Sequence, residues 1–291
     1  MSSCSSCGAQ NSCANASKNG GSGHCSDAMQ QQEIAIASTL SNIKHKIFVM
    51  SGKGGVGKSS VTVNLAAALA MRGKNVGILD VDIHGPSIPR MLGLSSSIEM
   101  DAEGKLMLPA SYSENLVVMS MDALLMDKDQ AILWRGPKKT AAIRQFLSDV
   151  KWGALDYLVI DSPPGTGDEH MTILQAIPDA ECIAVTTPQE VSLADVRKAL
   201  DFLRHTKATI LGIVENMSGL VCPHCHQEID LFKKGGGVDL AQKYEIPFLQ
   251  AIPLDPFTVV SADTGIPVVK VDNESPAKLA FGALAEKILQ G

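Results

Sequence analysis

A glycine-rich loop between an apolar run and a helical pattern constrains this chain more than any other feature. The run KIFVM at residues 46–50 leads directly into SGKGGVGKSS at residues 51–60. The loop fits the spacing G-x-x-x-x-G-K-[ST] from Gly52 to Ser59. A strand, this loop and a helix form a phosphate cradle, because backbone N–H groups and the positive end of the helix converge on the same anion. The pattern predicts a nucleotide-binding α/β fold.

Within the loop, different groups suit different parts of Mg-ATP. Lys58 is expected to reach the β- and γ-phosphates, and the Ser59 hydroxyl is expected to bind Mg²⁺. The residues expected to contact the nucleotide are Gly52, Lys53, Gly54, Gly55, Val56, Gly57, Lys58, Ser59 and Ser60. A chance match by a glycine-rich turn is the alternative, and the flanking strand and helix patterns argue against it.

Short apolar runs alternate with helical patterns along the rest of the chain. Strands are predicted at residues 46–50, 75–80, 116–120, 156–160, 182–186, 208–214 and 246–252. Apolar residues at helical spacing predict helices at 59–73 and 193–206. This alternation indicates a doubly wound, mostly parallel sheet covered on both faces. Ligands of such sheets bind beyond the carboxyl ends of the strands.

Acidic residues follow two of the predicted strands. Asp161 follows the run DYLVI, and an aspartate at the end of a buried strand is the expected partner of Mg²⁺, directly or through water. The segment from Pro163 to Gly167 is then expected to be a switch loop that senses the γ-phosphate. Asp80 and Asp82 follow another strand, and a structural role is expected for Asp80. Acidic residues of a surface loop are the alternative.

Charge and hydropathy argue against several other classes. The 291 residues carry a net charge of −6 without a basic stripe, so nucleic acid is not an expected partner. No run of about 18 apolar residues predicts a membrane span, and no export signal is recognisable. Seven cysteines in such a chain favour metal or redox roles over disulfides. We therefore expect a cytoplasmic protein without a membrane partner.

The beginning of the chain differs in composition from the rest. Ser, Gly, Asn and Ala dominate residues 1 to 30, and such a segment cannot offset its ordering entropy by burial. We expect a flexible tail over residues 1–32 and one P-loop ATPase domain over residues 33–291. The tail nevertheless holds four of the seven cysteines, namely Cys4, Cys7, Cys13 and Cys25.

The stretch VCPHCHQEID at residues 221–230 contains half of a metal site. Cys222 and Cys225 form a C-x-x-C pair, whereas a tetrahedral zinc or a [4Fe–4S] cluster takes four ligands. Spacing alone favours zinc and a cluster equally, with His224 or His226 as further zinc ligands. A redox pair is a third interpretation, but the early thioredoxin-like context is missing.

A set of motifs in one order resembles a known family. The motifs are GKGGVGKSS, DVDIHGPSIPRMLG, WRGPKK, DYLVIDSPPGTGDEH, VTTPQEVSLADV, ENMSG and CPHC. The two-lysine loop resembles the deviant Walker A group of P-loop NTPases, which includes Min and Par proteins and the nitrogenase iron protein. Over about residues 40 to 290 the set resembles the Mrp or ApbC-type iron–sulfur cluster carrier ATPases, to which GPSIPRMLG and CPHC point in particular.

The resemblance implies roles for individual residues around the nucleotide. Lys53 is expected to cross a dimer interface to the phosphates of the facing subunit, where it would stabilise charge as an arginine finger does. Asp82 is expected to lie near Mg²⁺ and the attacking water, and to serve hydrolysis together with Lys53 and Lys58. Asn216 of ENMSG is expected to contact the adenine edge. A solvated loop lysine and a turn asparagine are the alternatives for Lys53 and Asn216.

The resemblance also implies how the half-site is completed. In a twofold homodimer, Cys222 and Cys225 of both subunits supply four thiolates to a bridging, transferable [4Fe–4S] cluster. In the tail, relatives from the eukaryotic cytosolic branch carry C-x13-C-x2-C-x5-C, whereas only three residues precede Cys4 here. Cys25 can serve as the fourth ligand beside Cys4, Cys7 and Cys13, because a flexible Gly-rich loop can close the intervening stretch at modest entropic cost. A site completed by another chain and reactive thiols on a disordered tail are the alternatives.

The expected function is an ATP-dependent, slowly hydrolysing carrier that delivers a [4Fe–4S] cluster to apo-proteins. Two rival functions stay open, a Min- or Par-like positioning ATPase and a nitrogenase-iron-protein-like electron donor. The first needs a membrane-targeting helix or a basic surface, but the final segment 275–291 is not basic and is expected to pack on the body. The second group ligates its cluster with widely separated single cysteines, unlike the C-x-x-C pair of this chain.

Overall fold

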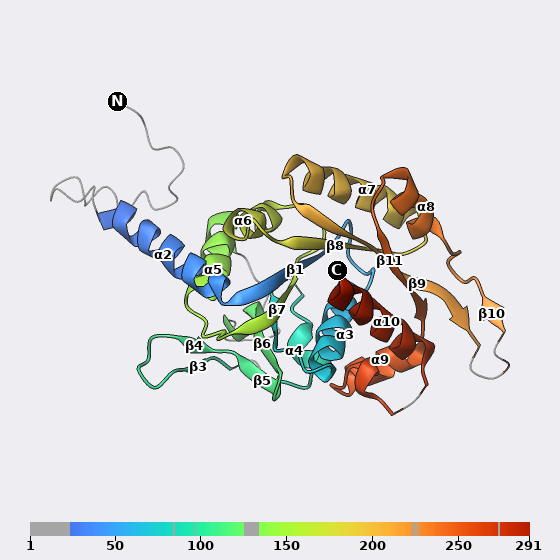
Figure 1. Cartoon of the computed structure of the whole chain (residues 1–291), viewed down its shortest axis with the longest axis horizontal. Coiled ribbons are helices and arrows are strands. Elements are labelled where there is room, and N and C mark those ends of the chain that lie inside the picture. Colours follow the sequence, from blue (N-terminus) through green and yellow to red (C-terminus); the bar gives the residue numbers. More distant parts are fainter. Residues whose placement is uncertain are drawn as a thin grey trace.

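The computed structural model describes residues 24–83, 85–95, 97–124, 134–222, 225, 227–272 and 274–291. A sheet of nine strands forms its centre, in the order β10-β9-β8-β1-β7-β2-β6-β5, with β11 paired to β9 (Figure 1). The parallel strands are β1 (Ile43–Ser51), β2 (Val76–Asp80), β6 (Leu116–Ser120), β7 (Leu155–Asp161), β8 (Glu181–Thr186), β9 (Thr209–Val221) and β11 (Phe248–Leu254). Every strand predicted from the sequence is present, and the doubly wound, mostly parallel α/β fold is confirmed.

Four short strands were not predicted. β5 (Ala110–Ser113) and β10 (Glu228–Ile229) pair antiparallel with β6 and β9, and β3 (Glu99–Met100) and β4 (Met107–Leu108) form a separate two-stranded sheet. Each is two to four residues long, which is too short for an apolar run to mark it.

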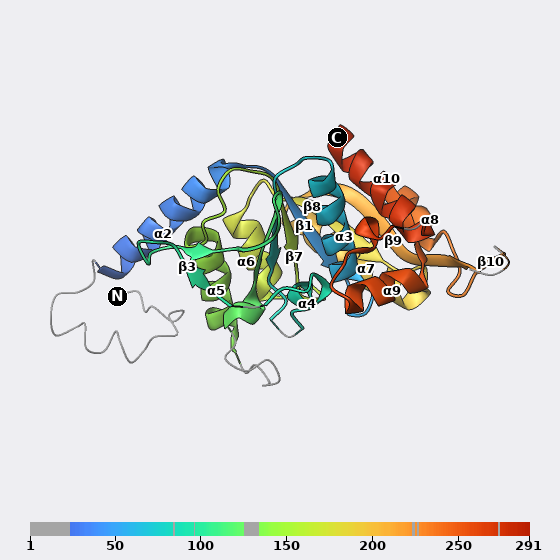
Figure 2. The ribbon, with the colours of Figure 1, turned by 90° about the horizontal axis from the view of Figure 1, so that it is seen from below.

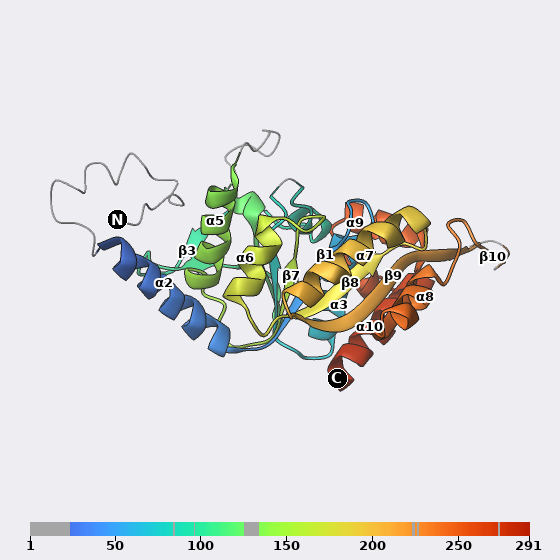
Figure 3. The same ribbon diagram turned by 90° about the horizontal axis from the view of Figure 1, so that it is seen from above.

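Helices cover both faces of the sheet. The α-helices are α2 (His24–Ser41), α3 (Lys58–Met71), α4 (Ile88–Met91), α5 (Gly136–Ser148), α6 (Asp168–Ala176), α7 (Glu190–His205), α8 (Gly236–Lys243), α9 (Pro256–Asp263) and α10 (Pro276–Gln290), with 3₁₀ turns η1 (Met121–Leu124) and η2 (Val268–Lys270). α3, α9 and α10 lie on the face seen in Figure 2, and α5, α6 and α7 lie on the face seen in Figure 3. No helix among the residues that the structure describes is long and apolar enough to span a membrane.

The continuous apolar strands follow from this double cover. Ile47 and Val49 of β1 belong to the core under α3 and α10, whereas Phe48 and Met50 belong to the core under α5 and α6. Because successive side chains of a strand point to opposite faces, a strand covered on both faces must be apolar at every position.

The last helix packs on the body, as the sequence predicted. α10 contacts α3 and β11, and its Phe281 and Leu284 are fully buried. Arg72 at the end of α3 donates to the Gly282 carbonyl and pairs with Glu286 at 3.0 Å. The segment that a positioning ATPase would need for membrane targeting is therefore part of the core.

The first helix lies partly inside the range that the sequence assigns to the tail. α2 begins at His24, and its Ile36 and Leu40 are buried. Arg144 of α5 pairs with Glu33 of α2 at 2.6 Å, so that α2 is fastened to α5. α2 and the β9–β10 hairpin lie at opposite ends of the long axis (Figure 1).

Two turns meet backbone to backbone beside the carboxyl edge of the sheet. Gly93 after α4 and Gly265 after α9 both have positive φ, at 61° and 75°. A Cβ atom on Gly265 would lie 2.7 Å from the Cα atom of Gly93. Only glycine permits this approach, which joins α4 to α9.

Candidate functional site

The phosphate loop is held in place by its glycines. Gly57 ends the loop with φ 81°, a left-handed conformation that favours glycine, and α3 begins at the next residue. A Cβ atom on Gly52 would lie 2.2 Å from the carbonyl carbon of Asp195 in α7. The Ser51 hydroxyl donates to the Lys53 carbonyl at 2.9 Å. The loop is therefore fixed between β1, α3 and α7.

A cavity of about 310 Å³ opens over this loop at the carboxyl edge of the sheet. Its lining includes every residue expected to contact nucleotide in the loop except Gly52, and Asp82 lies in it as well. The other lining residues are Ser51, Ser87, Met91 and Pro164. The volume falls at the lower end of the range of small-molecule sites.

The expected phosphate and Mg²⁺ ligands converge at one point. Asp161 accepts from the Ser59 hydroxyl at 2.6 Å and from the Thr62 hydroxyl at 2.7 Å. Lys58 Nζ lies 2.8 Å from the Asp161 carboxylate, and both side chains are almost fully buried. Hydroxyl and carboxylate oxygens are the ligands that Mg²⁺ prefers, so the donor set fits that ion. Thr62 was not predicted, although it lies one helical turn beyond Ser59 on α3.

A second carboxylate lies behind this cluster. Asp80 is fully buried, and burial together with the charge of Asp161 raises its pKa to about 8. It accepts from the Ser120 hydroxyl at 2.9 Å and from the Asp82 N–H at 3.1 Å. Asp80 thus joins the ends of neighbouring strands, whereas Asp82 lines the cavity.

The loop after Asp161 lies against the phosphate loop. The Gly165 N–H donates to the Ser51 carbonyl at 2.9 Å, and Pro164 lines the cavity. At the far end of the loop, the Gly167 N–H donates to His170 Nδ1 at 3.1 Å. The predicted switch segment is therefore tied to β1 at one end and to α6 at the other.

The WRGPKK motif fastens the start of α6 to α5. Lys139 pairs with Glu169 at 2.7 Å, and the two side chains are only 13% and 14% exposed. Lys138 lies over the Trp134 ring, 4.3 Å from its centroid. Sequence spacing gave no role to this motif, because its partner lies thirty positions away.

His170 makes the stability of this region pH-dependent. It is fully buried between Phe48 and Phe202, and burial lowers its pKa from 6.5 to about 4, against the opposing charge of Glu169. Above pH 6.5 the histidine is neutral in both the folded and the unfolded state, so its burial does not make the free energy of unfolding depend on pH. Below that pH the unfolded chain takes up a proton that the folded chain resists, so stability falls as the pH falls towards 4.

We expect this histidine to contribute a loss of about 3 kcal/mol in the free energy of unfolding between neutral pH and pH 4. Urea unfolding of wild type and His170→Gln at a series of pH values measures it, because glutamine does not titrate. The two curves should converge as the pH falls. His205→Gln, at an exposed position, is the control and should leave the slope unchanged. Parallel curves for wild type and His170→Gln would contradict the assignment.

Asn216 contacts the phosphate loop in this structure. Its Nδ2 donates to the Val56 carbonyl at 2.9 Å, and a Cβ atom on Gly57 would lie 2.1 Å from that nitrogen. The residue is buried in β9, directly after the last residue that pairs with β8. The adenine contact expected from the resemblance stays a prediction, but the asparagine does lie beside the cavity floor.

The cysteine pair lies at the tip of the β9–β10 hairpin. Cys222 directly follows β9, and its N–H donates to the Gln227 carbonyl at 3.0 Å. Cys225 is exposed. His224 and His226 lie outside the described residues. Within the described part of the chain, no group of three or more His, Cys, Asp or Glu side chains is placed to hold a metal ion.

The remaining cysteines fall into two groups. Cys4, Cys7 and Cys13 lie outside the described residues, and Cys25 lies in the first turn of α2. Cys182 is fully buried in β8, where burial raises its pKa to about 12. Cys182 is therefore a small buried apolar side chain of the core.

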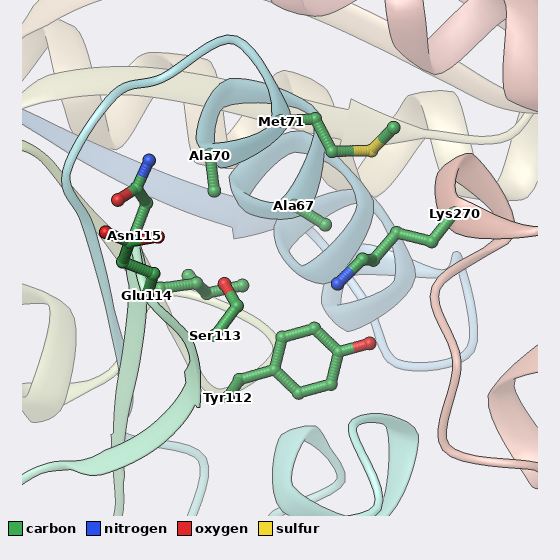
Figure 4. A pocket seen from close by; sticks show the side chains of 9 residues that line it. Ala67, Ala70, Met71, Tyr112, Ser113, Glu114, Asn115 and Lys270 are labelled. Atoms are coloured by element: carbon green, nitrogen blue, oxygen red, sulfur yellow. The ribbon is translucent and has the colours of Figure 1, made fainter.

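A second hollow, of about 170 Å³, lies at the opposite edge of the sheet (Figure 4). It is enclosed by the end of α3, the β5–β6 turn and Lys270, whose Nζ lies 4.5 Å from the centroid of the Tyr112 ring. Because α3 runs about 20 Å from the phosphate loop to this edge, the hollow is separate from the nucleotide cavity.

A phosphate loop after the central strand of a parallel sheet, with a lysine, a serine and an aspartate converging beside it, defines the class of P-loop NTPases. The family model of NUBPL iron-transfer P-loop NTPases, within the ParA group, matches residues 42–289, and the chain belongs to this family. The resemblance inferred from the motifs is thereby confirmed.

Individual relatives agree with this family. The chain is 48% identical to the iron-sulfur cluster carrier protein of Methanocaldococcus jannaschii over 99% of this chain and 95% of the relative. It is 48% identical to human cytosolic Fe-S cluster assembly factor NUBP2 over 89% of this chain and 97% of the relative.

Solved structures share the fold. A nucleotide-binding protein from Archaeoglobus fulgidus in complex with ADP is 41% identical, with a TM-score of 0.71 over 81% of this chain and 92% of that chain. The cell division ATPase MinD of Pyrococcus furiosus is 27% identical, with a TM-score of 0.63 over 84% of this chain and 98% of that chain.

Proposed function

We propose that this protein is an ATP-hydrolysing carrier that holds a [4Fe–4S] cluster between two copies of the chain and delivers it to apo-proteins. The observation that carries the proposal is the course of β9. This strand contacts the phosphate loop through Asn216 and ends at Val221, directly before Cys222, so one element joins a nucleotide site to half of a cluster site. The names of the relatives in Methanocaldococcus jannaschii and human support the same function.

The nucleotide is held by the groups that converge on Asp161. Lys58 would contact the phosphates, and Ser59 and Asp161 would hold Mg²⁺, which neutralises the charge of the transferring phosphoryl group. Asp82 would orient the attacking water from its place in the cavity lining. Lys53, which lines the same cavity, would reach the nucleotide of the facing subunit. Asn216 would contact the adenine edge from its position beside the phosphate loop.

The cluster is the cargo of this carrier. The β9–β10 hairpin supplies two thiolates. A second copy of the chain, related by a twofold axis beside this hairpin, would supply the other two. Ligation shared between two subunits also suits release of the cluster, because a change in the arrangement of the subunits changes the positions of the four thiolates. Cys4, Cys7, Cys13 and Cys25 would hold a second cluster. A cytoplasmic location is supported by the word cytosolic in the names of the eukaryotic relatives.

Iron, acid-labile sulfide and zinc in protein purified without oxygen test the proposal, with subunit mass measured on the same sample. Wild type should contain roughly four irons and four sulfides per dimer at the hairpin site. Cys222→Ser/Cys225→Ser should lose them, whereas Cys182→Ser, at a buried position, should not. Iron that survives in the double variant would belong to the tail cysteines. Stoichiometric zinc without sulfide, retained after anaerobic reconstitution, would overturn the carrier function.

A further inference from the structure

The path between the two sites contains a local irregularity. Asn216 and Leu220 of β9 pair with Ile252 and Leu254 of β11, so that three residues of β9 stand opposite one residue of β11. Two of these three, Met217 and Gly219, have φ values of 57° and 72°. A methionine in the left-handed region is uncommon and is maintained only where its surroundings impose it. We call residues 217–219 the bulge.

A buried carboxylate next to Asn216 imposes that conformation. Glu215 is fully buried, and its Oε1 accepts from the Ser218 hydroxyl in the bulge at 2.6 Å. The same carboxylate accepts from the backbone N–H groups of Gly235 at 3.0 Å and Gly237 at 2.5 Å. These amides lie at the amino-terminal end of α8, where the helix dipole favours a negative charge.

The segment before α8 in turn holds the second arm of the cysteine hairpin. Lys234 pairs with Glu228 at 2.5 Å and with Asp230 at 3.3 Å. Its side chain also covers Gly219, because a Cβ atom there would lie 2.3 Å from Lys234 Cε. Both arms of the hairpin therefore depend on contacts that meet at Glu215, one through the bulge and one through residues 234–237.

We propose that Glu215 is a positioning residue that fixes the Cys222–Cys225 hairpin relative to the phosphate loop, so that nucleotide binding is transmitted to the cysteines. This inference rests on the proposed function. Asn216 is hydrogen-bonded to the phosphate loop and moves with it. Its neighbour Glu215 is hydrogen-bonded to both the bulge and the start of α8. A rigid clamp transmits a displacement of β9, whereas a loose bulge would absorb it.

Alkylation of the cysteines in metal-free protein tests this transmission without a cluster. The labelling rate of Cys225 by iodoacetamide is measured by mass spectrometry with and without a non-hydrolysable ATP analogue and Mg²⁺. In wild type the analogue should change the rate severalfold. In Glu215→Gln the rate should be the same in both conditions. The amide has one acceptor oxygen where the carboxylate has two, so its NH₂ group replaces either the acceptor of Gly237 or the shared acceptor of Gly235 and Ser218, and the bulge and the start of α8 are no longer held together. Glu286→Gln, on the surface of α10, should behave as wild type.

If Glu215→Gln folds poorly, the milder variant Ser218→Ala tests the same inference. It removes only the bond to the bulge and should reduce the effect of the analogue at least twofold. Analogue binding and thermal unfolding are measured on each variant, since a purely structural role would lower stability without changing the ratio of labelling rates. A ratio unchanged in both variants, or a wild-type rate indifferent to nucleotide, would overturn the inference. Absence of bound iron in the wild-type protein would instead overturn the proposed function.

Discussion

Replacement of Lys58 by methionine is expected to lower kcat for ATP hydrolysis by roughly 100-fold or more and to destabilise the folded protein by about 3 kcal/mol. The first effect follows because Lys58 would stabilise charge on the transferring phosphoryl group in a water-poor site. The second follows because Asp161, at 1% side-chain exposure, loses the cation that lies 2.8 Å away. Burial makes an uncompensated carboxylate expensive.

The double variant Lys58→Met/Asp161→Asn separates the two effects. Asparagine removes the buried charge and still accepts a hydrogen bond from Ser59 or Thr62, so most of the lost stability should return. Hydrolysis should not return, because both the proposed phosphate ligand and the proposed Mg²⁺ ligand are removed. Urea unfolding and steady-state hydrolysis measure the two quantities. Lys105→Met, at an exposed ion pair, is the control. A single variant as stable as wild type would contradict the buried ion pair.

Mixing two inactive variants is expected to restore hydrolysis if Lys53 acts on the facing subunit. Lys53→Ala should lower kcat on the order of 10³-fold, as removal of an arginine finger does. Asp161→Asn should be inactive for lack of the Mg²⁺ ligand. In a mixed dimer, the Lys53→Ala subunit keeps its own Asp161 and receives Lys53 from its partner. Random exchange makes half of the dimers mixed, each with one complete site, so about a quarter of wild-type activity should appear.

The control for this experiment mixes Lys53→Ala with the double variant Lys53→Ala/Asp161→Asn, which cannot supply a lysine to any site. Activity should stay at the level of the single variants. If the first mixture is equally inactive although mass measurement shows mixed dimers, Lys53 acts within its own subunit. If no dimers form with ATP, the shared nucleotide site itself is wrong.

The parallel core was predictable from sequence because its signals are local. The runs KIFVM and DYLVI are apolar at every position after the first, as strands covered on both faces must be, and the phosphate loop marks where the first of them ends. The antiparallel edges were not predictable, since β5 reads ASYS and β10 has two residues. The beginning of α2, up to residue 32, was placed in the tail because its residues are mostly polar and form no apolar pattern.

The site was predictable only to the extent that its parts are motifs. Lys58, Ser59 and Asp161 follow from local patterns, and the structure brings them within hydrogen-bonding distance of one another. The role of Glu215 has no such signal. Its carboxylate binds amides twenty and twenty-two positions away, and a glutamate after a strand does not indicate where the chain will return. Burial of a charged side chain becomes visible only in three dimensions.

The contact between Gly93 and Gly265 sets the way in which the nucleotide edge can deform. Two peptide backbones without side chains between them do not interlock, so they offer little resistance to sliding. α4, whose Met91 lines the nucleotide cavity, and α9, which presents Phe257 and Val260 to solvent, therefore meet along a shear plane rather than at a hinge. A displacement of α4 would slip along α9 and leave its apolar surface where it was.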